Sequence, residues 1–226
     1  MEKISFCAQK GKRLAVAGKI GSGKSTVLKI IMRLMEYDEG EYLINSTSVR
    51  EIDTRSIREK IAYVPQEPSV FSASVLDNIT LFSKSVDEKS LKTALKVSQL
   101  EYDISKFPQG LNTQVGNRGF SVSGGQKQRI CLARALIKNP DFLIIDDATN
   151  AMDAQTEENF WRDFSQYFSS CGCVLATHRT KTLEKSDHII VLDQGKTAES
   201  GTHEDLISRD SLYKKIYEKA KMEESE

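Results

Sequence analysis

The segment at residues 18–26, GKIGSGKST, constrains the possible fold more than any other part of the sequence. A short apolar run at 13–18 precedes it, and a helical pattern with apolar positions as far as Met35 follows it. Glycines allow backbone N–H groups to turn inward around an anion, and the helix N-terminus adds partial positive charge. Because the spacing GxxxxGKS between a strand and a helix is that of a P-loop, we expect Lys24 to bridge two phosphates and Ser25 to bind Mg²⁺. The predicted phosphate-binding residues are Gly18, Gly21, Ser22, Gly23, Lys24, Ser25 and Thr26.

Strand patterns alternate with helical patterns along the rest of the chain, which favours an α/β fold. Continuous apolar runs at 142–146 and 173–178 are typical of parallel strands buried on both faces. The chain from about 74 to 110 is mostly polar and helical in pattern, which indicates an inserted helical subdomain. The other expected elements are strands at 39–45 and 60–66, helices at 53–60 and 123–139, a hairpin turning at Gln194–Gly195, and a charged, frayed helix from 212.

We therefore expect a single domain over residues 1–226, with a core of about 1–67 and 136–226 and a helical subdomain of about 68–135. No apolar run approaches the roughly 20 residues of a membrane-spanning helix, and no signal-peptide pattern is visible near the start. The formal net charge at pH 7 is +0, so composition gives no electrostatic argument for a nucleic-acid partner.

Cysteine usage is typical of a reducing, cytosolic setting. Cys7 and Cys131 lie in apolar patterns, so we expect both to pack as small hydrophobic residues. Cys171 and Cys173 are separated by one residue, which is too close for an ordinary disulfide and short of zinc-ligand spacing.

A second glycine-rich segment, VSGGQKQR at 122–129, also lies where a helix begins. Its residues Ser123, Gly124 and Gly125 would form another anion cradle. One chain has no need of two phosphate cradles for one triphosphate, unless the second cradle serves the nucleotide of a neighbour. Further along, Asp146 ends an apolar strand, where a P-loop protein places its Mg²⁺-directed carboxylate.

Six segments in this order resemble the nucleotide-binding domain of the ATP-binding cassette (ABC) family, and the resemblance covers nearly the whole chain. Each short segment is a weak signal by itself, but six in register are strong. They are the Walker A motif at Gly18–Thr26, the Q-loop glutamine Gln66, the signature at Ser123–Gln126 with Val122 in place of the usual leucine, the Walker B motif at Phe142–Asp146, the D-loop at 150–153, and the switch histidine His178.

The resemblance implies a P-loop NTPase (RecA-like) core and an ATPase that works as a head-to-tail dimer of two such domains. Each ATP would lie between the P-loop of one chain and the signature of the other, and the dimer would close on ATP and open after hydrolysis. Ser25, Gln66 and Asp146 would arrange Mg²⁺ and water. The remaining implied site residues are Asp147 and His178, together with Gln66, for catalysis, and Ser123, Gly124, Gly125, Gln126 and Asp153 for the partner's nucleotide.

Two further segments resemble those of ABC exporters. TQVGNRG at 113–119 is similar to the exporter X-loop, with Gln114 and Asn117 replacing two acidic residues, and 69–79 is similar to the segment that faces the membrane domain. We therefore expect a cassette at the cytoplasmic face of a membrane, with a transmembrane domain N-terminal in a longer chain. A soluble ABC ATPase of DNA repair or translation would typically show a coiled-coil insertion or two cassettes, and neither is visible. Peptide, lipid, drug and ion stay equally open as substrates.

Family members usually carry earlier strands and an aromatic residue that stacks on adenine, and no such segment precedes the P-loop strand here. Phe6 matches a core position instead. We expect weak ATP binding by the isolated chain, because stacking of a base on an aromatic side chain contributes about 1–3 kcal/mol.

The residue after the Walker B aspartate departs from the family, which usually has Glu where this chain has Asp147. Asp is shorter by one methylene, and a misplacement of about 1 Å can cost on the order of 10²-fold in rate. We expect slow hydrolysis. The alternative is a catalytically weakened, regulatory cassette of a heterodimer whose partner carries the Glu; because His178 is retained, a homodimer with two slow sites also stays open. Taken singly, Gln66, His178 and Asp153 also have structural explanations, and Asp153 is a good helix N-cap.

Overall fold

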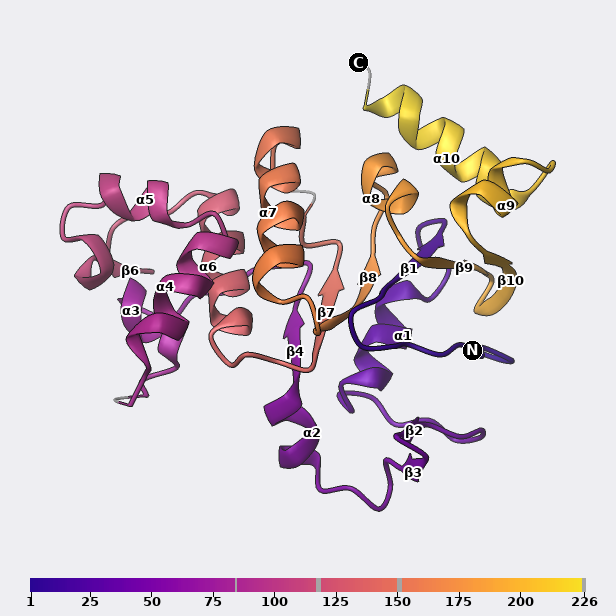
Figure 1. The fold of residues 1–226 in the computed structure, drawn as a ribbon, viewed down its shortest axis with the longest axis horizontal. Helices are drawn as coiled ribbons and strands as arrows, with labels where there is room; N and C mark the ends of the chain where they lie inside the picture. The colour runs from indigo at the N-terminus through magenta and orange to yellow at the C-terminus, as the bar shows by residue number, and fades with distance from the viewer. Residues whose placement is uncertain (84, 117–118, 150–151, 225–226) are drawn as a thin grey trace.

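The computed structural model describes residues 1–83, 85–116, 119–149 and 152–224 (Figure 1). A six-stranded sheet runs through it in the spatial order β10-β9-β1-β8-β7-β4. Neighbouring strands are parallel, except that β9 and β10 form the predicted antiparallel hairpin. The strands are β1 Arg13–Gly18, β4 Ile61–Val64, β7 Phe142–Asp146, β8 Gly172–Ala176, β9 His188–Asp193 and β10 Lys196–Gly201.

Helices cover both faces of this sheet, because side chains of a parallel strand need apolar partners on each face. Leu28 of α1 and Ile57 of α2 pack on one face, where they join Val174 of β8. Leu175 of β8 points to the opposite face, where α6 and α7 pack. Helices α8, α9 and α10 continue this second layer beside β1 and β9. The bounds are α1 Lys24–Ile31, α2 Thr54–Lys60, α6 Gly124–Leu136, α7 Ala154–Tyr167, α8 Thr180–Glu184, α9 His203–Ile207 and α10 Leu212–Glu223.

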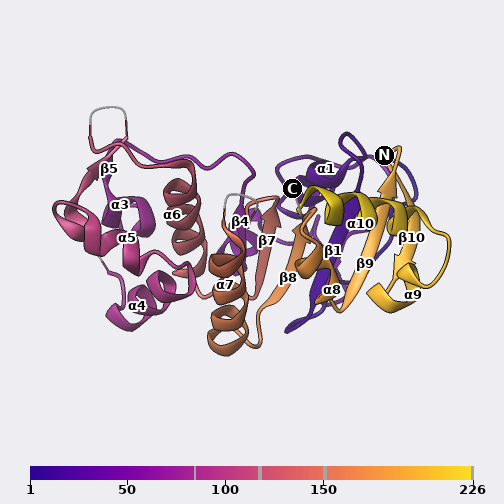
Figure 2. The ribbon, with the colours of Figure 1, turned by 90° about the horizontal axis from the view of Figure 1, so that it is seen from above.

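A helical subdomain stands beside the sheet, as Figure 2 shows from above. It is formed by α3 (Val75–Thr80), α4 (Glu88–Val97), α5 (Glu101–Lys106), η1 (Gly110–Asn112) and α6, with the antiparallel ribbon of β5 (Ala73–Ser74) and β6 (Gln114–Val115).

Helix α6 belongs to both parts of the molecule. Its residues Ile130 and Ala133 lie in the core of the helical subdomain, whereas Leu132 and Leu136 lie in the cluster against the sheet. The predicted α/β fold with an inserted helical subdomain is therefore confirmed.

The segment after α1 differs from the prediction. The helix ends at Ile31, and Arg33 has a φ of 49°, a left-handed conformation that stops a helix. As a result Leu34 and Met35, predicted on the apolar face of the helix, are exposed. The strand predicted at 39–45 is likewise reduced to β2 (Leu43–Ile44), which pairs with β3 (Thr47–Ser48).

The C-terminal helix is packed rather than frayed. Tyr213, Tyr217 and Ala220 of α10 are buried against the sheet layer, and Tyr213 is 0% exposed. Their spacing places them on one face of a helix, and the charged residues between them occupy the other face. None of the described helices is both long and apolar enough to cross a membrane.

The N-terminal segment gives a mixed result. Phe6 packs against the cluster of α1 and α2, as its core position predicts. Cys131 is buried as predicted, but the prediction for Cys7 was wrong, because its side chain is exposed in a stretch without regular structure.

Candidate functional site

Most of the predicted catalytic and phosphate-binding residues converge at one edge of the sheet. Parallel strands end at the same edge, and β1, β8 and β7 are adjacent. Asp146, the last residue of β7, lies opposite Ala176 of β8, so the segment with His178 leaves the sheet beside it. The P-loop begins at Gly18, the last residue of β1.

The P-loop backbone has the conformation that its glycines predict. Gly18, Gly21 and Gly23 have φ values of 150°, 79° and 105°. At Gly18 a Cβ would lie 2.5 Å from the carbonyl oxygen of Leu192, so no larger residue fits. Ser22 Oγ is buried and has no hydrogen-bond partner among the described residues, and a phosphate oxygen is a group that would satisfy it. The loop therefore fits a bound phosphate.

Lys24 lies buried beneath this loop. Its Nζ donates to the carbonyl oxygens of Gly18 at 2.9 Å and Lys19 at 3.2 Å. Burial lowers the pKa of Lys24, and the nearby carboxylates of Asp147 and Asp146 oppose that shift. Because the partners it is bonded to are neutral carbonyls, the ammonium is placed to attract an anion.

Ser25 and Asp146 form the oxygen pair expected of a Mg²⁺ site. Ser25 Oγ donates to Asp146 Oδ1 at 2.9 Å, and Asp146 is buried. A hydroxyl and a carboxylate are the hard oxygen ligands that Mg²⁺ uses beside phosphates and water. The described residues include no cluster of three or more His, Cys, Asp or Glu able to hold a metal. The predicted Mg²⁺ ligands are instead the Ser25 hydroxyl, the Asp146 carboxylate and the Gln66 amide. Gln66 lies exposed beyond the end of β4.

Tyr63 is a site residue that the sequence did not reveal. Its hydroxyl donates to Asp146 Oδ2 at 3.1 Å. Burial and the charge of Asp146 raise the pKa of Tyr63, so the hydroxyl stays protonated and orients the carboxylate. In the sequence Tyr63 belongs to the apolar pattern of β4, and nothing marks its hydroxyl as different from a core aromatic residue.

Asp147 and His178 face each other at the same edge. Asp147 Oδ2 lies 3.9 Å from His178 Nε2, and the side chains are 10% and 37% exposed. Burial first, and then the charge of Lys24, lower the pKa of His178, while Asp147 and Glu223 oppose the shift. A neutral histidine can both accept and donate a hydrogen bond, which suits contact with water or a phosphate.

Helix α6, which the signature residues begin, stands apart from the P-loop helix α1 (Figures 1 and 2). Ser123 is the N-cap of α6 and forms a capping box with Gln126. Both views place α6 and α1 apart, with β4 and β7 between them (Figures 1 and 2). Ser123 and Gly124 are exposed, and a Cβ on Gly124 would meet nothing within 4 Å. The turn is thus open to a ligand from outside the chain.

The D-loop prediction is only partly covered, since residues 150 and 151 lie outside the described residues, as do 117 and 118 of the X-loop. Asp153 is the N-cap of α7 and accepts from Thr156 N at 2.9 Å. Arg179, which the sequence did not single out, donates from Nη2 to the carbonyl oxygen of Met152 at 2.6 Å. Arg179, the residue after His178, therefore contacts the end of the predicted D-loop.

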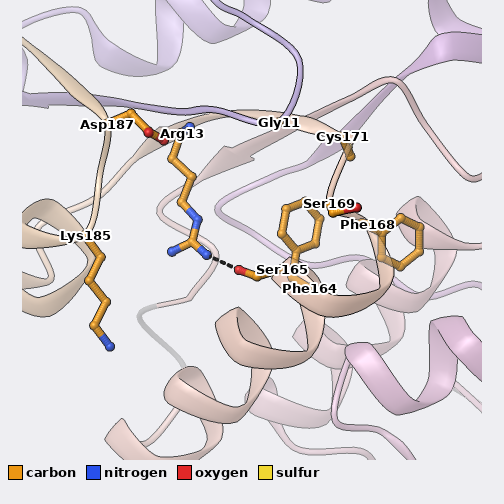
Figure 3. A pocket seen from close by; sticks show the side chains of 9 residues that line it. All are labelled: Gly11, Arg13, Phe164, Ser165, Phe168, Ser169, Cys171, Lys185 and Asp187. Atoms are coloured by element: carbon orange, nitrogen blue, oxygen red, sulfur yellow. Dashed lines mark hydrogen bonds between the residues drawn. The ribbon is translucent and has the colours of Figure 1, made fainter.

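A hollow of about 400 Å³ lies at the opposite edge of the sheet, near the start of β1. In Figure 3 the guanidinium of Arg13 points across it to Ser165, which accepts a hydrogen bond at 2.5 Å. Asp187, Lys185 and Cys171 also line it. None of the predicted site residues is among those that line the hollow, so the candidate site is the P-loop edge, where most of them converge.

Comparison with known proteins gives consistent matches. The chain matches the family model described as ABC transporter over residues 1–150. It is 39% identical over 218 residues to the uncharacterized ABC transporter ATP-binding protein YfiB of Bacillus subtilis (strain 168), covering 96% of this chain and 38% of that protein. It is 38% identical over 218 residues to the mitochondrial iron-sulfur clusters transporter ATM1 of Yarrowia lipolytica, covering 96% of this chain and 31% of that protein.

A solved structure described as a bacterial Atm1-family ABC exporter with ATP bound is also similar, with a TM-score of 0.90 at 35% identity. That match covers 96% of this chain and 38% of the other. The chain thus spans between 31% and 38% of the length of these relatives.

Proposed function

Because this chain belongs to the ABC transporter family, as a nucleotide-binding domain of exporter type, we propose that it binds and hydrolyses MgATP to drive transport across a membrane. The observation that carries the proposal is the convergence of Lys24, Ser25 and Asp146 at the carboxyl edge of the sheet. A buried ammonium beside a glycine turn suits the phosphates, and the hydroxyl–carboxylate pair suits the metal.

Each residue at this edge has its own role in the proposed reaction. Lys24 and the P-loop N–H groups hold the β- and γ-phosphates, and Mg²⁺, held by Ser25, Asp146 and Gln66, would neutralise charge on them. Tyr63 fixes the orientation of the Asp146 carboxylate. Asp147 orients or deprotonates the attacking water, and His178 contacts the γ-phosphate or that water.

Hydrolysis is slow in this proposal, because Asp147 is one methylene shorter than the usual Glu. A regulatory cassette in a heterodimer is the second candidate, and Asp147 supports it as well. Retention of His178 beside Asp147, at 3.9 Å, favours slow hydrolysis over complete loss.

A second nucleotide-binding domain completes the site in this proposal. Ser123, Gly124, Gly125 and Gln126 of one chain contact the ATP held by the other, with Asp153 near the contact. A transmembrane domain joins the assembly and places it at the cytoplasmic face of a membrane. The cargo belongs to that membrane domain, and the names of the relatives do not transfer it to this chain.

The test compares two lysines of one loop. We expect Lys24→Ala to weaken MgATP binding about tenfold or more, because the buried ammonium is lost from the phosphates. Lys19→Ala is the matched control, because Lys19 is exposed and contributes its carbonyl oxygen to Lys24. Isothermal titration with MgATP and a phosphate-release assay measure both. Equal binding by Lys24→Ala and the wild type would contradict the proposal.

A further inference from the structure

A hydrogen-bond network that includes a carboxylate of α5 holds the turn that precedes α6. Gln126 N donates to Ser123 Oγ at 3.2 Å, and Ser123 N donates to Gln126 Oε1 at 2.9 Å. The other end of the same amide, Gln126 Nε2, donates to Asp103 Oδ1 of α5 at 3.1 Å. Arg129 Nε donates to Asp103 Oδ2 at 2.7 Å. Each oxygen of one carboxylate thus holds one side chain of α6.

Only one orientation of the Gln126 amide satisfies both of its neighbours. An ionised carboxylate only accepts and the backbone N–H of Ser123 only donates, so the NH₂ end must face Asp103 and the oxygen must face Ser123. Asp103 is 6% exposed, so water does not readily replace a lost partner. The buried carboxylate therefore fixes the shape of a turn whose outer side is open.

We propose that Asp103 is a positioning residue for the signature turn and, through Gln126, sets the geometry with which Ser123 and Gly124 meet the ATP of the second subunit. This inference rests on the proposed function, in which that turn acts on a partner's nucleotide. Asp103 lies on α5, behind α6, and acts only through the side chains of α6. The guanidinium of Arg129 balances the charge of the Asp103 carboxylate. The side chain of Arg129 is 16% exposed and that of Asp103 is 9% exposed.

The variant Asp103→Asn keeps the shape of the side chain but mismatches its hydrogen bonds. The NH₂ of the new amide must face either Gln126 Nε2 or Arg129 Nε, and both are donors. If Gln126 turns its amide to compensate, two donors meet at Ser123. We expect MgATP-dependent dimerisation, measured by analytical ultracentrifugation, to weaken about tenfold, the size of one lost hydrogen bond to a charged group.

MgATP binding by the single chain should respond differently from dimerisation. Asp103→Asn should leave MgATP binding by the single chain within about twofold of wild type, because the chain's own P-loop is untouched. Glu101→Gln is the matched control, since Glu101 is an exposed carboxylate of the same helix and should alter neither property. Equal loss of binding within the chain would overturn the proposal and indicate a general folding role.

A second substitution should rescue the first. In the double variant Asp103→Asn with Gln126→Glu, the new carboxylate at 126 would accept from Ser123 N and from the NH₂ group of the new amide at 103. The oxygen of that amide would accept from Arg129. Because Gln126 belongs to the proposed contact with the partner's ATP, the double variant is compared with Gln126→Glu alone, in which two carboxylates meet. The double variant should dimerise about tenfold more tightly than that single variant, and this comparison also serves if Asp103→Asn alone fails to fold. Absence of rescue overturns the inference, whereas a wild-type chain that binds MgATP and stays monomeric contradicts the homodimer within the proposed function.

Discussion

Asp147 has a backbone φ of 48°, in the left-handed region that most side chains avoid. Its N–H donates to the carbonyl oxygen of Ala176 at 3.1 Å, so the neighbouring strand fixes this conformation. Left-handed backbone costs roughly 1–2 kcal/mol per residue for most side chains, and Asp is one of the few that adopt it readily. Compared with the Glu that is usual in the family, Asp at this position therefore favours local stability. Its carboxylate extends less far toward the proposed attacking water.

We expect Asp147→Glu to raise ATP turnover about tenfold or more, because the added methylene restores about 1 Å of reach. The free energy of unfolding should fall by about 1 kcal/mol, because Glu adopts left-handed backbone less readily. A phosphate-release assay at saturating MgATP and urea unfolding measure the two effects. Asp147→Asn is the control: it keeps the size and the backbone preference but removes the base, so only turnover should fall. Unchanged turnover in Asp147→Glu would show that reach is not the limiting defect.

Two helices of this chain begin in the same way, which allows a comparison at the scale of the element. Asp153 caps α7 by accepting from Thr156 N at 2.9 Å and from its hydroxyl at 2.7 Å. Asp87 caps α4 by accepting from Ser90 N at 2.8 Å and from its hydroxyl at 2.9 Å. Both carboxylates are exposed. Capping alone therefore gives no reason for the two to differ in function.

Replacing either aspartate by Ala should cost about 1 kcal/mol of unfolding free energy, because each change removes a helix N-cap. In addition, only Asp153→Ala should weaken MgATP-dependent dimerisation, because Asp153 ends the D-loop that we propose to face the partner. Urea unfolding and analytical ultracentrifugation separate the two effects. If both variants dimerise like the wild type, Asp153 is a helix cap and nothing more.

The elements differ in how far the sequence predicts them. Strands β7 and β8 were predictable because a strand buried on both faces leaves a continuous apolar run. The end of α1 was not, since the turn is made by Arg33 in a left-handed conformation rather than by a glycine. The packing of α10 was hidden because its buried residues, Tyr213 and Tyr217, stand among Lys and Glu. The Tyr63 hydroxyl was equally hidden, since only its contact with Asp146 distinguishes it from a core residue.

At the scale of the whole molecule, the two predicted phosphate cradles of one chain belong to different parts of the fold. The P-loop lies at the carboxyl edge of the sheet, and the signature turn opens α6 on the far side of β4 and β7 (Figure 2). Both are open to solvent, and Ile20 of the P-loop is 96% exposed. Two chains related by two-fold symmetry can bring each cradle to the other's nucleotide, which makes two equivalent sites.

If each ATP site combines the P-loop of one chain with the signature of the other, two variants that are inactive alone should recover ATP turnover when mixed. Lys24→Ala removes the phosphate-binding ammonium, and Ser123→Arg blocks the signature turn, so neither variant alone should hydrolyse ATP. In a mixed dimer, the P-loop of the Ser123→Arg chain meets the intact signature of the Lys24→Ala chain, and one of the two sites works. An equimolar mixture should therefore recover about a quarter of wild-type turnover, because about half of the dimers are mixed.

The control replaces the Ser123→Arg chain by one that carries both substitutions. Mixed with Lys24→Ala, it supplies no intact P-loop, so turnover should stay at background. Recovery in the first mixture but not in the second requires that a P-loop and a signature from different chains act on one ATP. Background turnover in both mixtures, with an active wild type, would instead mean that each chain hydrolyses ATP with its own residues, and the head-to-tail arrangement would be wrong.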